Sequence, residues 1–337
     1  MQVFNRRSKE AFLKAAIVTG PNQTPIFEDF QEPRWSDGYE LISVTASALS
    51  HATRALASSA HYAALNNYPR VVGTDGVGST QAGQRVYFTM PEAPFGGMAE
   101  TTLVKKENCV LLPADVDDIT AAAIANPGLS SVAALKVRAR LESGECVLVN
   151  GATGSAGKLA VQIARFMGAR KIIATGRDSN TLEKLKSLGA DVTISLLLDA
   201  VELEQALAEQ FRGEGVDIIL DYLYGERGEF IISSLSKESR RIKPIRYVVV
   251  GGGSGQEITL PSTVLRSVPI AIMGSGVGSV SYANLIGAAS DVIRAVVPAK
   301  LEIDTTVVPL ADIGKTWNQS TGKSRIVFVT TGAHFSG

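Results

Sequence analysis

The residues with the clearest chemistry form a glycine-rich turn between an apolar run and a helical stretch. The apolar run 147–149 leads into the turn 150–157, and helical spacing begins near Lys158. Small residues in such a turn let backbone N–H groups approach a pyrophosphate, and the N-terminus of the following helix favours negative charge. An ordinary glycine-rich turn that binds nothing is the alternative. We predict that the turn binds a dinucleotide through Ala152, Thr153, Gly154, Ser155, Ala156 and Gly157.

The next apolar run, residues 171–175, indicates which dinucleotide binds. It is followed by Gly176, Arg177 and Asp178. An acidic residue at this strand end would hydrogen-bond the ribose hydroxyls of NAD and repel a 2′-phosphate. Gly176 leaves room for that phosphate and Arg177 offers a bidentate donor, so the pair favours NADPH. Asp178 argues for NAD, because it would supply the acid if the ribose-binding position lay two residues further along the chain. Arg177 could also be a solvated residue at the start of a helix.

Three kinds of segment must position these residues. Short β-branched or alternating runs between residues 12 and 110, bounded by turn-forming residues, predict a β-rich half. Residues 121–141 show helical spacing of Ala and Leu after the turn-forming Asn126-Pro127-Gly128. From residue 146, continuous apolar runs alternate with amphipathic stretches, which is typical of a parallel sheet covered on both faces. Residues 281–337 return to one helix and short strands.

We therefore predict an α/β protein in which a Rossmann cofactor domain, residues 123–279, is inserted in a β-rich domain. That domain is formed by residues 1–122 and 280–337. The length agrees, because 337 residues correspond to about two domains.

The composition argues against several classes of function. The chain has 33 basic and 33 acidic side chains, so its formal charge of zero provides no field for nucleic acid or an anionic membrane. No apolar run of about 18 residues occurs, and the N-terminus has no signal-peptide core. We expect a cytoplasmic protein with no nucleic-acid or membrane partner.

Cysteine and histidine are too few and too scattered for a metal site. Cys109 and Cys146 form no CxxC pair, and His51, His61 and His334 show no metal-binding spacing. We predict that no metal is bound and that both cysteines pack as small buried apolar residues.

The order of elements and several motifs resemble the medium-chain dehydrogenase/reductase superfamily, and within it the zinc-independent quinone oxidoreductase branch. The resemblance runs from about residue 13 to 330 and is carried by segments 69–78, 83–87, 96–100 and 126–131, together with the turn 152–157, which resembles an AxGxxG turn. It implies a GroES-like fold for the β-rich domain and a place for Asn126 in the loop that opens the cofactor domain.

The sequence departs from the zinc enzymes of this superfamily at the expected metal ligands. Ser50, Thr74 and Pro127 stand at those positions, Asp75 follows Thr74, and the cysteine-rich structural zinc loop is missing. Hydroxyls hold Zn²⁺ poorly and a proline side chain cannot ligate. If no metal ion acts as a Lewis acid, the oxidation of an alcohol is disfavoured. Hydride transfer from NADPH to a quinone or α,β-unsaturated carbonyl remains feasible.

Three residues are candidates for contact with such a substrate. Ser50 could hydrogen-bond a quinone oxygen, His51 could donate a proton, and Tyr62 could stack on the acceptor. Each has a structural alternative: a turn serine, a partly exposed histidine and a tyrosine packed under a loop. The usual Asn and Asp of the branch are replaced at Ser50 and Thr53, so their roles do not carry over.

Further cofactor residues are expected after the later strands. These are Asp221, Tyr222, Gly251, Gly252 and Gly274, with a plain strand-ending turn as the alternative for each group. The apolar run 269–273 predicts an outer strand that pairs with a second copy of the chain, so we expect a homodimer that Ile272→Lys would shift toward monomer or aggregate. The alternative is a monomer in which a loop or helix of the same chain covers this edge.

Two other functions stay open at this point. One is a zinc-type alcohol dehydrogenase with an unexpected metal. The other is a non-enzymatic NADPH-binding sensor, because a fold does not fix a function.

Overall fold

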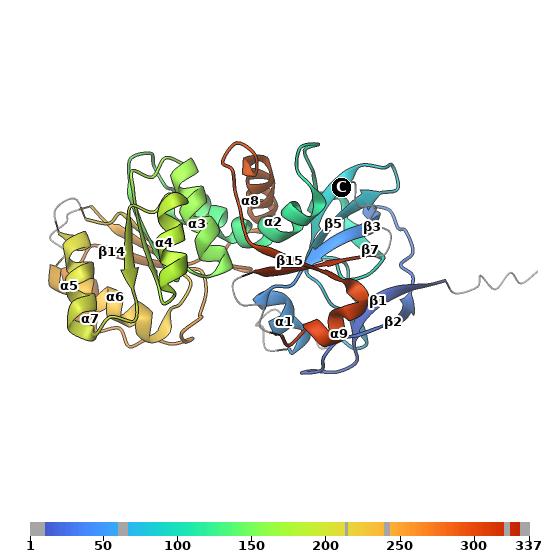
Figure 1. Cartoon of the computed structure of the whole chain (residues 1–337), viewed down its shortest axis with the longest axis horizontal. Helices are drawn as coiled ribbons and strands as arrows, with labels where there is room; N and C mark the ends of the chain where they lie inside the picture. The colour runs from blue at the N-terminus through green and yellow to red at the C-terminus, as the bar shows by residue number, and fades with distance from the viewer. Residues whose placement is uncertain (1–10, 60–66, 213–214, 239–242, 320–323, 331–337) are drawn as a thin grey trace, which may run out of the picture. The chain divides into compact units, whose positions relative to one another are not determined.

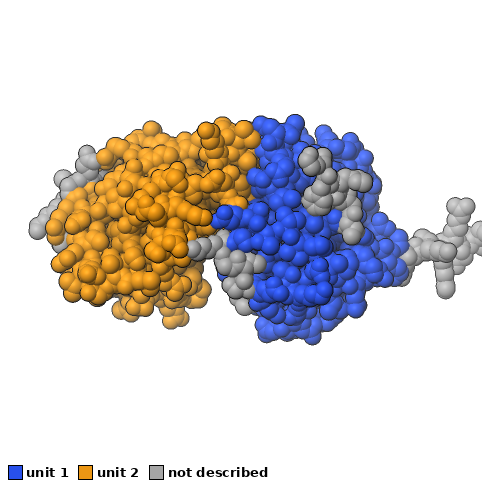
Figure 2. Space-filling view, in the orientation of Figure 1, with its two compact units in different colours: residues 1–123, 304–337 blue, residues 124–303 orange. Residues whose placement is uncertain are grey.

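The computed structural model describes residues 11–59, 67–212, 215–238, 243–319 and 324–330. These residues form two compact units, shown in different colours in Figure 2. Unit 1 comprises residues 1–123 and 304–337, and unit 2 comprises residues 124–303. The first boundary lies within one residue of the predicted one. The second falls after Ile303 rather than after residue 279, because the helix 282–295 packs within unit 2.

Unit 1 is built from two sheets (Figure 1). The smaller has the order β2-β1-β4, and the larger has the order β15-β16-β3-β5-β6-β8 with β7 paired to β3. Its strands are β1 (Phe12–Val18), β2 (Ile26–Gln31), β3 (Tyr39–Ala48), β4 (Arg70–Val71), β5 (Asp75–Thr80), β6 (Arg85–Thr89), β7 (Thr101–Lys105), β8 (Cys109–Leu111), β15 (Thr305–Pro309) and β16 (Arg325–Val329). The C-terminal strands β15 and β16 therefore complete the β-rich half, as the sequence predicts.

The helices of unit 1 are short. They are α1 (His51–Ala57), η1 (Lys106–Asn108), η3 (Leu310–Asp312) and α9 (Ile313–Thr316), and the longer α2 (Asp118–Val132) begins here and continues into unit 2. Ile313 and Trp317 pack in one apolar cluster with β1 and β16, so the C-terminal segment is part of the core.

Unit 2 contains a parallel sheet of six strands in the order β11-β10-β9-β12-β13-β14. The strands are β9 (Cys146–Asn150), β10 (Lys171–Gly176), β11 (Val192–Ser195), β12 (Ile218–Asp221), β13 (Ile245–Val249) and β14 (Ile270–Gly274). This is the strand order of a dinucleotide-binding fold, in which the chain reverses direction across the sheet beside β9. Ligands bind such sheets at the carboxyl ends of the strands.

Helices cover both faces of this sheet (Figure 1). They are η2, a π-helical stretch (Ala133–Ala139), α3 (Ser155–Phe166), α4 (Ser179–Ser187), α5 (Ala200–Phe211), α6 (Gly225–Glu238), α7 (Ser262–Ser267) and α8 (Tyr282–Ala295). Apolar side chains of α5, α6 and α7 pack against one face of β9, β10, β12 and β13. Strands buried on both faces explain the continuous apolar runs in the sequence.

The predicted turn at Asn126-Pro127-Gly128 is wrong. These residues lie inside α2, which continues through Pro127 to Val132. The Pro127 carbonyl accepts hydrogen bonds from the hydroxyls of Ser130 and Ser131. A Cβ on Gly128 would lie 2.7 Å from Val292 Cγ1, so glycine serves a close approach of α8 there instead of a turn.

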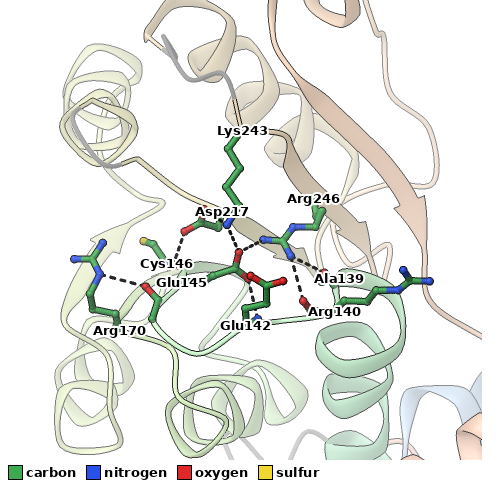
Figure 3. Close-up of polar contacts among 10 residues, drawn as sticks. Ala139, Arg140, Glu142, Glu145, Cys146, Arg170, Asp217, Lys243 and Arg246 are labelled. Carbon is green, nitrogen blue, oxygen red and sulfur yellow. Dashed lines mark hydrogen bonds and ion pairs between the residues drawn. The ribbon is translucent and has the colours of Figure 1, made fainter.

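A charged cluster closes the amino edge of the parallel sheet, opposite the carboxyl ends of the strands (Figure 3). Glu145 is 5% exposed and accepts hydrogen bonds from Arg246 Nη2 at 2.6 Å, Lys243 Nζ at 2.5 Å and the Glu142 backbone N–H at 3.0 Å. Arg246 also donates to the Ala139 carbonyl. The cluster fastens the end of η2 to the starts of β9 and β13.

The strand β14 lies at the edge of the sheet, as the sequence predicts. Ile272 is half-buried and packs against the core of unit 2. Pairing with a second copy stays a prediction.

Candidate cofactor and active site

The turn between β9 and α3 is shaped for close approach of backbone to a ligand. Gly151 has φ +86°, a conformation that favours glycine. A Cβ on Gly157 would lie 2.4 Å from the Gly151 carbonyl oxygen and 2.6 Å from Ala152 Cα, so the helix packs directly on the turn. Gly154, at the helix N-cap, is exposed.

The helix α3 begins at Ser155, three residues earlier than predicted, and no side chain caps its N-terminus. The N–H groups of a helix's first turn have no partner within the helix, and together with the helix dipole they form a site for an anion. Thr153, Ser155 and Ala156 are half-buried there, and Ala152 is fully buried beneath them. The geometry of this turn fits a pyrophosphate.

At the end of β10, the structure explains why no acid stands at position 176. A Cβ on Gly176 would lie 2.3 Å from Thr153 Cγ2 and 2.8 Å from Thr153 Oγ1. Asp178 is the N-cap of α4, and its Oδ1 accepts a hydrogen bond from the Thr181 N–H at 2.6 Å. Its carboxylate thus has a structural use, which weakens the argument for NAD drawn from the sequence.

A cavity of about 220 Å³ opens beside this strand end. It is lined by Arg177, Leu196, Leu223, Glu226, Arg227 and Ser254, from the segments that follow β10, β11, β12 and β13. Two guanidinium groups and the hydroxyl of Ser254 can donate to a phosphate, whereas Glu226 would repel one. The apolar walls Leu196 and Leu223 suit a flat ring. The chemistry of this lining fits the ribose phosphate and adenine end of NADPH.

Arg227 and Glu226 are site residues that the sequence did not reveal. Both lie in the first turn of α6, which begins at Gly225 directly after the β12 turn. The usable signal was the strand end at Asp221, because a helix that starts there brings its first residues to the carboxyl edge.

Asp221 lies below this edge instead of facing a ligand. It is fully buried, and its Oδ1 accepts from Asn150 Nδ2 at 2.7 Å and from the backbone N–H groups of Leu223 and Tyr224 at 2.8 and 3.0 Å. Its Oδ2 accepts from the Tyr247 hydroxyl. Asn150 Oδ1 accepts in turn from Thr175 Oγ1 at 2.7 Å. This network holds the ends of β9, β10, β12 and β13 in fixed relation, so the predicted contact of Asp221 with the cofactor is replaced by a positioning role.

Tyr222 packs against Ser131 and Gly251. The Tyr222 hydroxyl lies 2.8 Å from Ser131 Oγ, and burial raises the pKa of Tyr222 to about 12. A Cβ on Gly251 would lie 2.8 Å from the Tyr222 carbonyl oxygen. Gly252 is half-buried in the same turn, and Gly274, at the end of β14, accepts from Arg138 Nε through its carbonyl. Among the predicted cofactor residues, Gly274 lies on β14, the strand at the edge of the parallel sheet.

In unit 1, the turn before α1 carries the predicted substrate residues. Ser50 is the N-cap of α1 and is 8% exposed, and its Oγ accepts from the Thr53 N–H at 2.9 Å. His51 is the first helical residue and is exposed. Tyr62 lies outside the described residues, and Asn126 is half-buried within α2.

Ser50 belongs to a row of hydroxyls that ends on a buried carboxylate. Ser50 Oγ lies 2.8 Å from Thr53 Oγ1, and Thr53 Oγ1 lies 3.4 Å from Thr74 Oγ1. Thr74 donates to Asp75 Oδ1 at 2.6 Å, and the Tyr87 hydroxyl donates to Asp75 Oδ2 at 3.2 Å. Ser50 and Thr74, which the resemblance places at metal-ligand positions, are therefore linked through the hydroxyl of Thr53.

Other potential ligands do not gather. Within the described residues, no group of three or more His, Cys, Asp or Glu side chains could hold a metal ion. Cys146 is buried in unit 2, as predicted, whereas Cys109 in unit 1 is only partly buried, and burial raises the pKa of its thiol to about 12. In the same described part of the chain, no helix is both long and apolar enough to cross a membrane.

Comparisons with known proteins agree with this arrangement. A family model described as zinc-binding dehydrogenase matches residues 156–294. A probable NADPH-dependent quinone reductase of Emericella nidulans is 28% identical over 355 aligned positions, which cover 94% of this chain and 99% of that protein. A probable acrylyl-CoA reductase of Escherichia coli is 27% identical over 75% of this chain and 78% of its own length.

A solved structure shares the fold over nearly the whole chain. The quinone oxidoreductase from Thermus thermophilus superposes with a TM-score of 0.77 at 24% identity, over 94% of this chain and 99% of that one. The predicted fold class, a parallel-sheet domain inserted in a β-rich domain, is confirmed.

Proposed function

We propose that this chain, which belongs to the quinone oxidoreductase-like branch of the medium-chain dehydrogenase/reductase superfamily, is an NADPH-dependent reductase of quinones or α,β-unsaturated carbonyls. The observation that carries the proposal is the cavity lined by Arg177 and Arg227. It lies next to Gly176, where any side chain would press on Thr153. Relatives named as NADPH-dependent quinone reductase and acrylyl-CoA reductase support the same class of reaction.

The residues of unit 2 bind and orient the cofactor. Backbone N–H groups at the start of α3 hold the pyrophosphate, because they have no partner in the helix. Arg177 and Arg227 hold the 2′-phosphate with charged hydrogen bonds, and Leu196 and Leu223 pack on the adenine. Asp221 keeps these turns in register through Asn150 and the backbone of Leu223.

NADPH supplies a hydride when bound, so the protein mainly has to align an electron-poor acceptor with the cofactor and exclude water. In unit 1, the residues that we propose to contact the substrate are Ser50, His51 and Tyr62.

We propose further that the reaction needs no zinc. Ser50 and Thr74 present hydroxyls where zinc relatives have ligands, and neutral hydroxyls are poor ligands for Zn²⁺. The family model named for zinc binding matches residues 156–294, which include neither residue. An alcohol dehydrogenase with an unexpected metal would lose its activity to a chelator.

A steady-state assay tests the proposal. The purified chain is dialysed against a chelator and supplied with NADPH and, in separate reactions, a simple quinone, an enone and a primary alcohol with NADP⁺. We expect turnover with the quinone or the enone, unchanged by the chelator and by added Zn²⁺. Activity on the alcohol alone, restored by Zn²⁺, contradicts the proposal, and so does NADPH binding without any turnover.

A further inference from the structure

Asp75 is a buried hydrogen-bond acceptor at the inner end of the hydroxyl row in unit 1. It is fully buried, and the hydroxyls of Thr74 and Tyr87 both donate to it. Burial lowers the pKa of Arg325, and the attraction of Asp75 and then of Tyr87 opposes that shift. Arg325 is 8% exposed, and within the described residues its Nε and Nη2 have no hydrogen-bond partner. A guanidinium stays charged when buried and favours a charged carboxylate beside it.

The carboxylate fixes the direction of every hydrogen bond in the row. A hydroxyl has one proton to donate. Thr74 gives its proton to Asp75, so toward Thr53 it can only accept. Thr53 then gives its proton to Thr74 and accepts from Ser50, which lies 2.8 Å away.

Ser50 is left as an acceptor. Its proton is used toward Thr53, one lone pair accepts the Thr53 N–H at 2.9 Å, and one lone pair remains. In the opposite arrangement Thr53 would donate to Ser50, and the Thr53–Thr74 contact would have no proton between its two oxygens. That arrangement makes one hydrogen bond fewer in a largely buried place, where a hydrogen bond left unmade is costly. Chains of hydrogen bonds also reinforce one another when all run in one direction.

We propose that Asp75, acting through Thr74 and Thr53, sets Ser50 as a hydrogen-bond acceptor for an O–H group of its ligand. This O–H belongs to the reduced product, such as a hydroquinone. The inference rests on the proposed function and corrects the sequence-based expectation that Ser50 donates to a quinone oxygen. Asp75 and Thr74 are positioning residues, and the proton that completes the reduction comes from a source other than Ser50.

Binding measurements on the folded protein with NADP⁺ test this proposal. The probes are hydroquinone and its dimethyl ether, which has no O–H. Their affinity ratio cancels the shared packing of the ring. In Ser50→Ala and Thr74→Val we expect the ratio to fall about fivefold to tenfold, the size of one neutral hydrogen bond.

Two variants serve as controls. Thr74→Ser keeps the hydroxyl and should keep the wild-type ratio. Thr102→Val removes a fully buried hydroxyl that has no hydrogen-bond partner among the described residues, and it should also leave the ratio unchanged. Asp75→Asn can donate to Thr74 and so reverse the row, which should shift the preference of the site from hydroquinone toward quinone.

The proposal is overturned if folded Ser50→Ala leaves the probe ratio unchanged. These readouts are equilibria, so a failure of the proposed function, seen as no turnover by the wild-type chain, is distinguishable from a failure of this inference.

Discussion

The side chain of Thr153 fills the space into which any side chain at position 176 would extend. The two closest approaches to a Cβ on Gly176 are 2.3 Å from Thr153 Cγ2 and 2.8 Å from Thr153 Oγ1. The glycine-rich turn before α3 and the end of β10 are thus coupled by packing. The usual acid of an NAD site would force Thr153 to shift if it were introduced there.

We predict that Gly176→Asp lowers the free energy of unfolding by about 1–3 kcal/mol, the cost of overpacking a tight site. Thr153→Ala removes the two closest atoms and should recover most of this loss in the double variant. Denaturant unfolding of the four proteins of the cycle measures the effect. If the two substitutions lower stability additively, Thr153 and position 176 are not in contact.

A second prediction concerns the two arginines of the cavity. Arg177→Ala should weaken NADPH binding by about 1.5–3 kcal/mol, the range for a charged hydrogen bond, and leave NADH nearly unchanged. Arg227→Ala should have the same selective effect, because it lines the same cavity. Calorimetric titration of both cofactors checks this, with Arg266→Ala on α7 as a control. Equal losses of affinity for NADH and NADPH would show that the two arginines do not bind the 2′-phosphate.

The sequence predicted the fold more completely than the site. The parallel sheet and its first turn could be predicted because their signals are local. These signals are the continuous apolar runs of strands buried on both faces and the glycine-rich turn 150–157. Arg227 was missed because α6 begins at Gly225 and brings Arg227 to the same cavity as Arg177, a relation between segments far apart in the chain. The helical course of α2 through Pro127 was missed for a similar reason, since packing of Gly128 on Val292 outweighs the local turn preference.

Asp221 shows a different limit. Its position after a strand indicated a ligand contact, but a buried carboxylate with four donors around it is a structural group. Nothing in the local sequence distinguishes these two roles, because the donors come from β9, β13 and the next turn.

We predict that Asp221→Asn lowers both stability and cofactor affinity. The amide places an N–H against groups that already donate, and the lost charged hydrogen bonds correspond to about 2–3 kcal/mol of unfolding free energy. Asp217→Asn, at the opposite edge of the same sheet, is the matched control, because Asp217 accepts from the Cys146 N–H. Both variants should lose stability, and only Asp221→Asn should weaken NADPH. Equal NADPH binding by the two variants would show that Asp221 does not position the turns.

The Glu145 cluster predicts a pH dependence of stability (Figure 3). Burial alone would raise the pKa of Glu145, but hydrogen bonds from Arg246, the Glu142 N–H and Lys243 lower it below its ordinary value of 4.5. A carboxyl whose pKa is depressed in the folded state stabilises the protein above its unfolded pKa, and this contribution is lost as the pH falls through the folded value. The stability difference between wild type and Glu145→Gln should be constant near pH 7 and shrink below about pH 4.5. A difference that does not change over this range would show that the charge of Glu145 contributes nothing.

Hydride transfer to an organic acceptor is the central claim, and isotope labelling tests it most directly. NADPH carrying deuterium at the transferred position of the nicotinamide is incubated with the chelator-treated protein and an enone, and the product is examined by mass spectrometry. We predict a saturated carbonyl product with one deuterium on carbon, formed more slowly than with unlabelled NADPH. NADPH that stays bound and unoxidised, or a product without the label, would contradict the account.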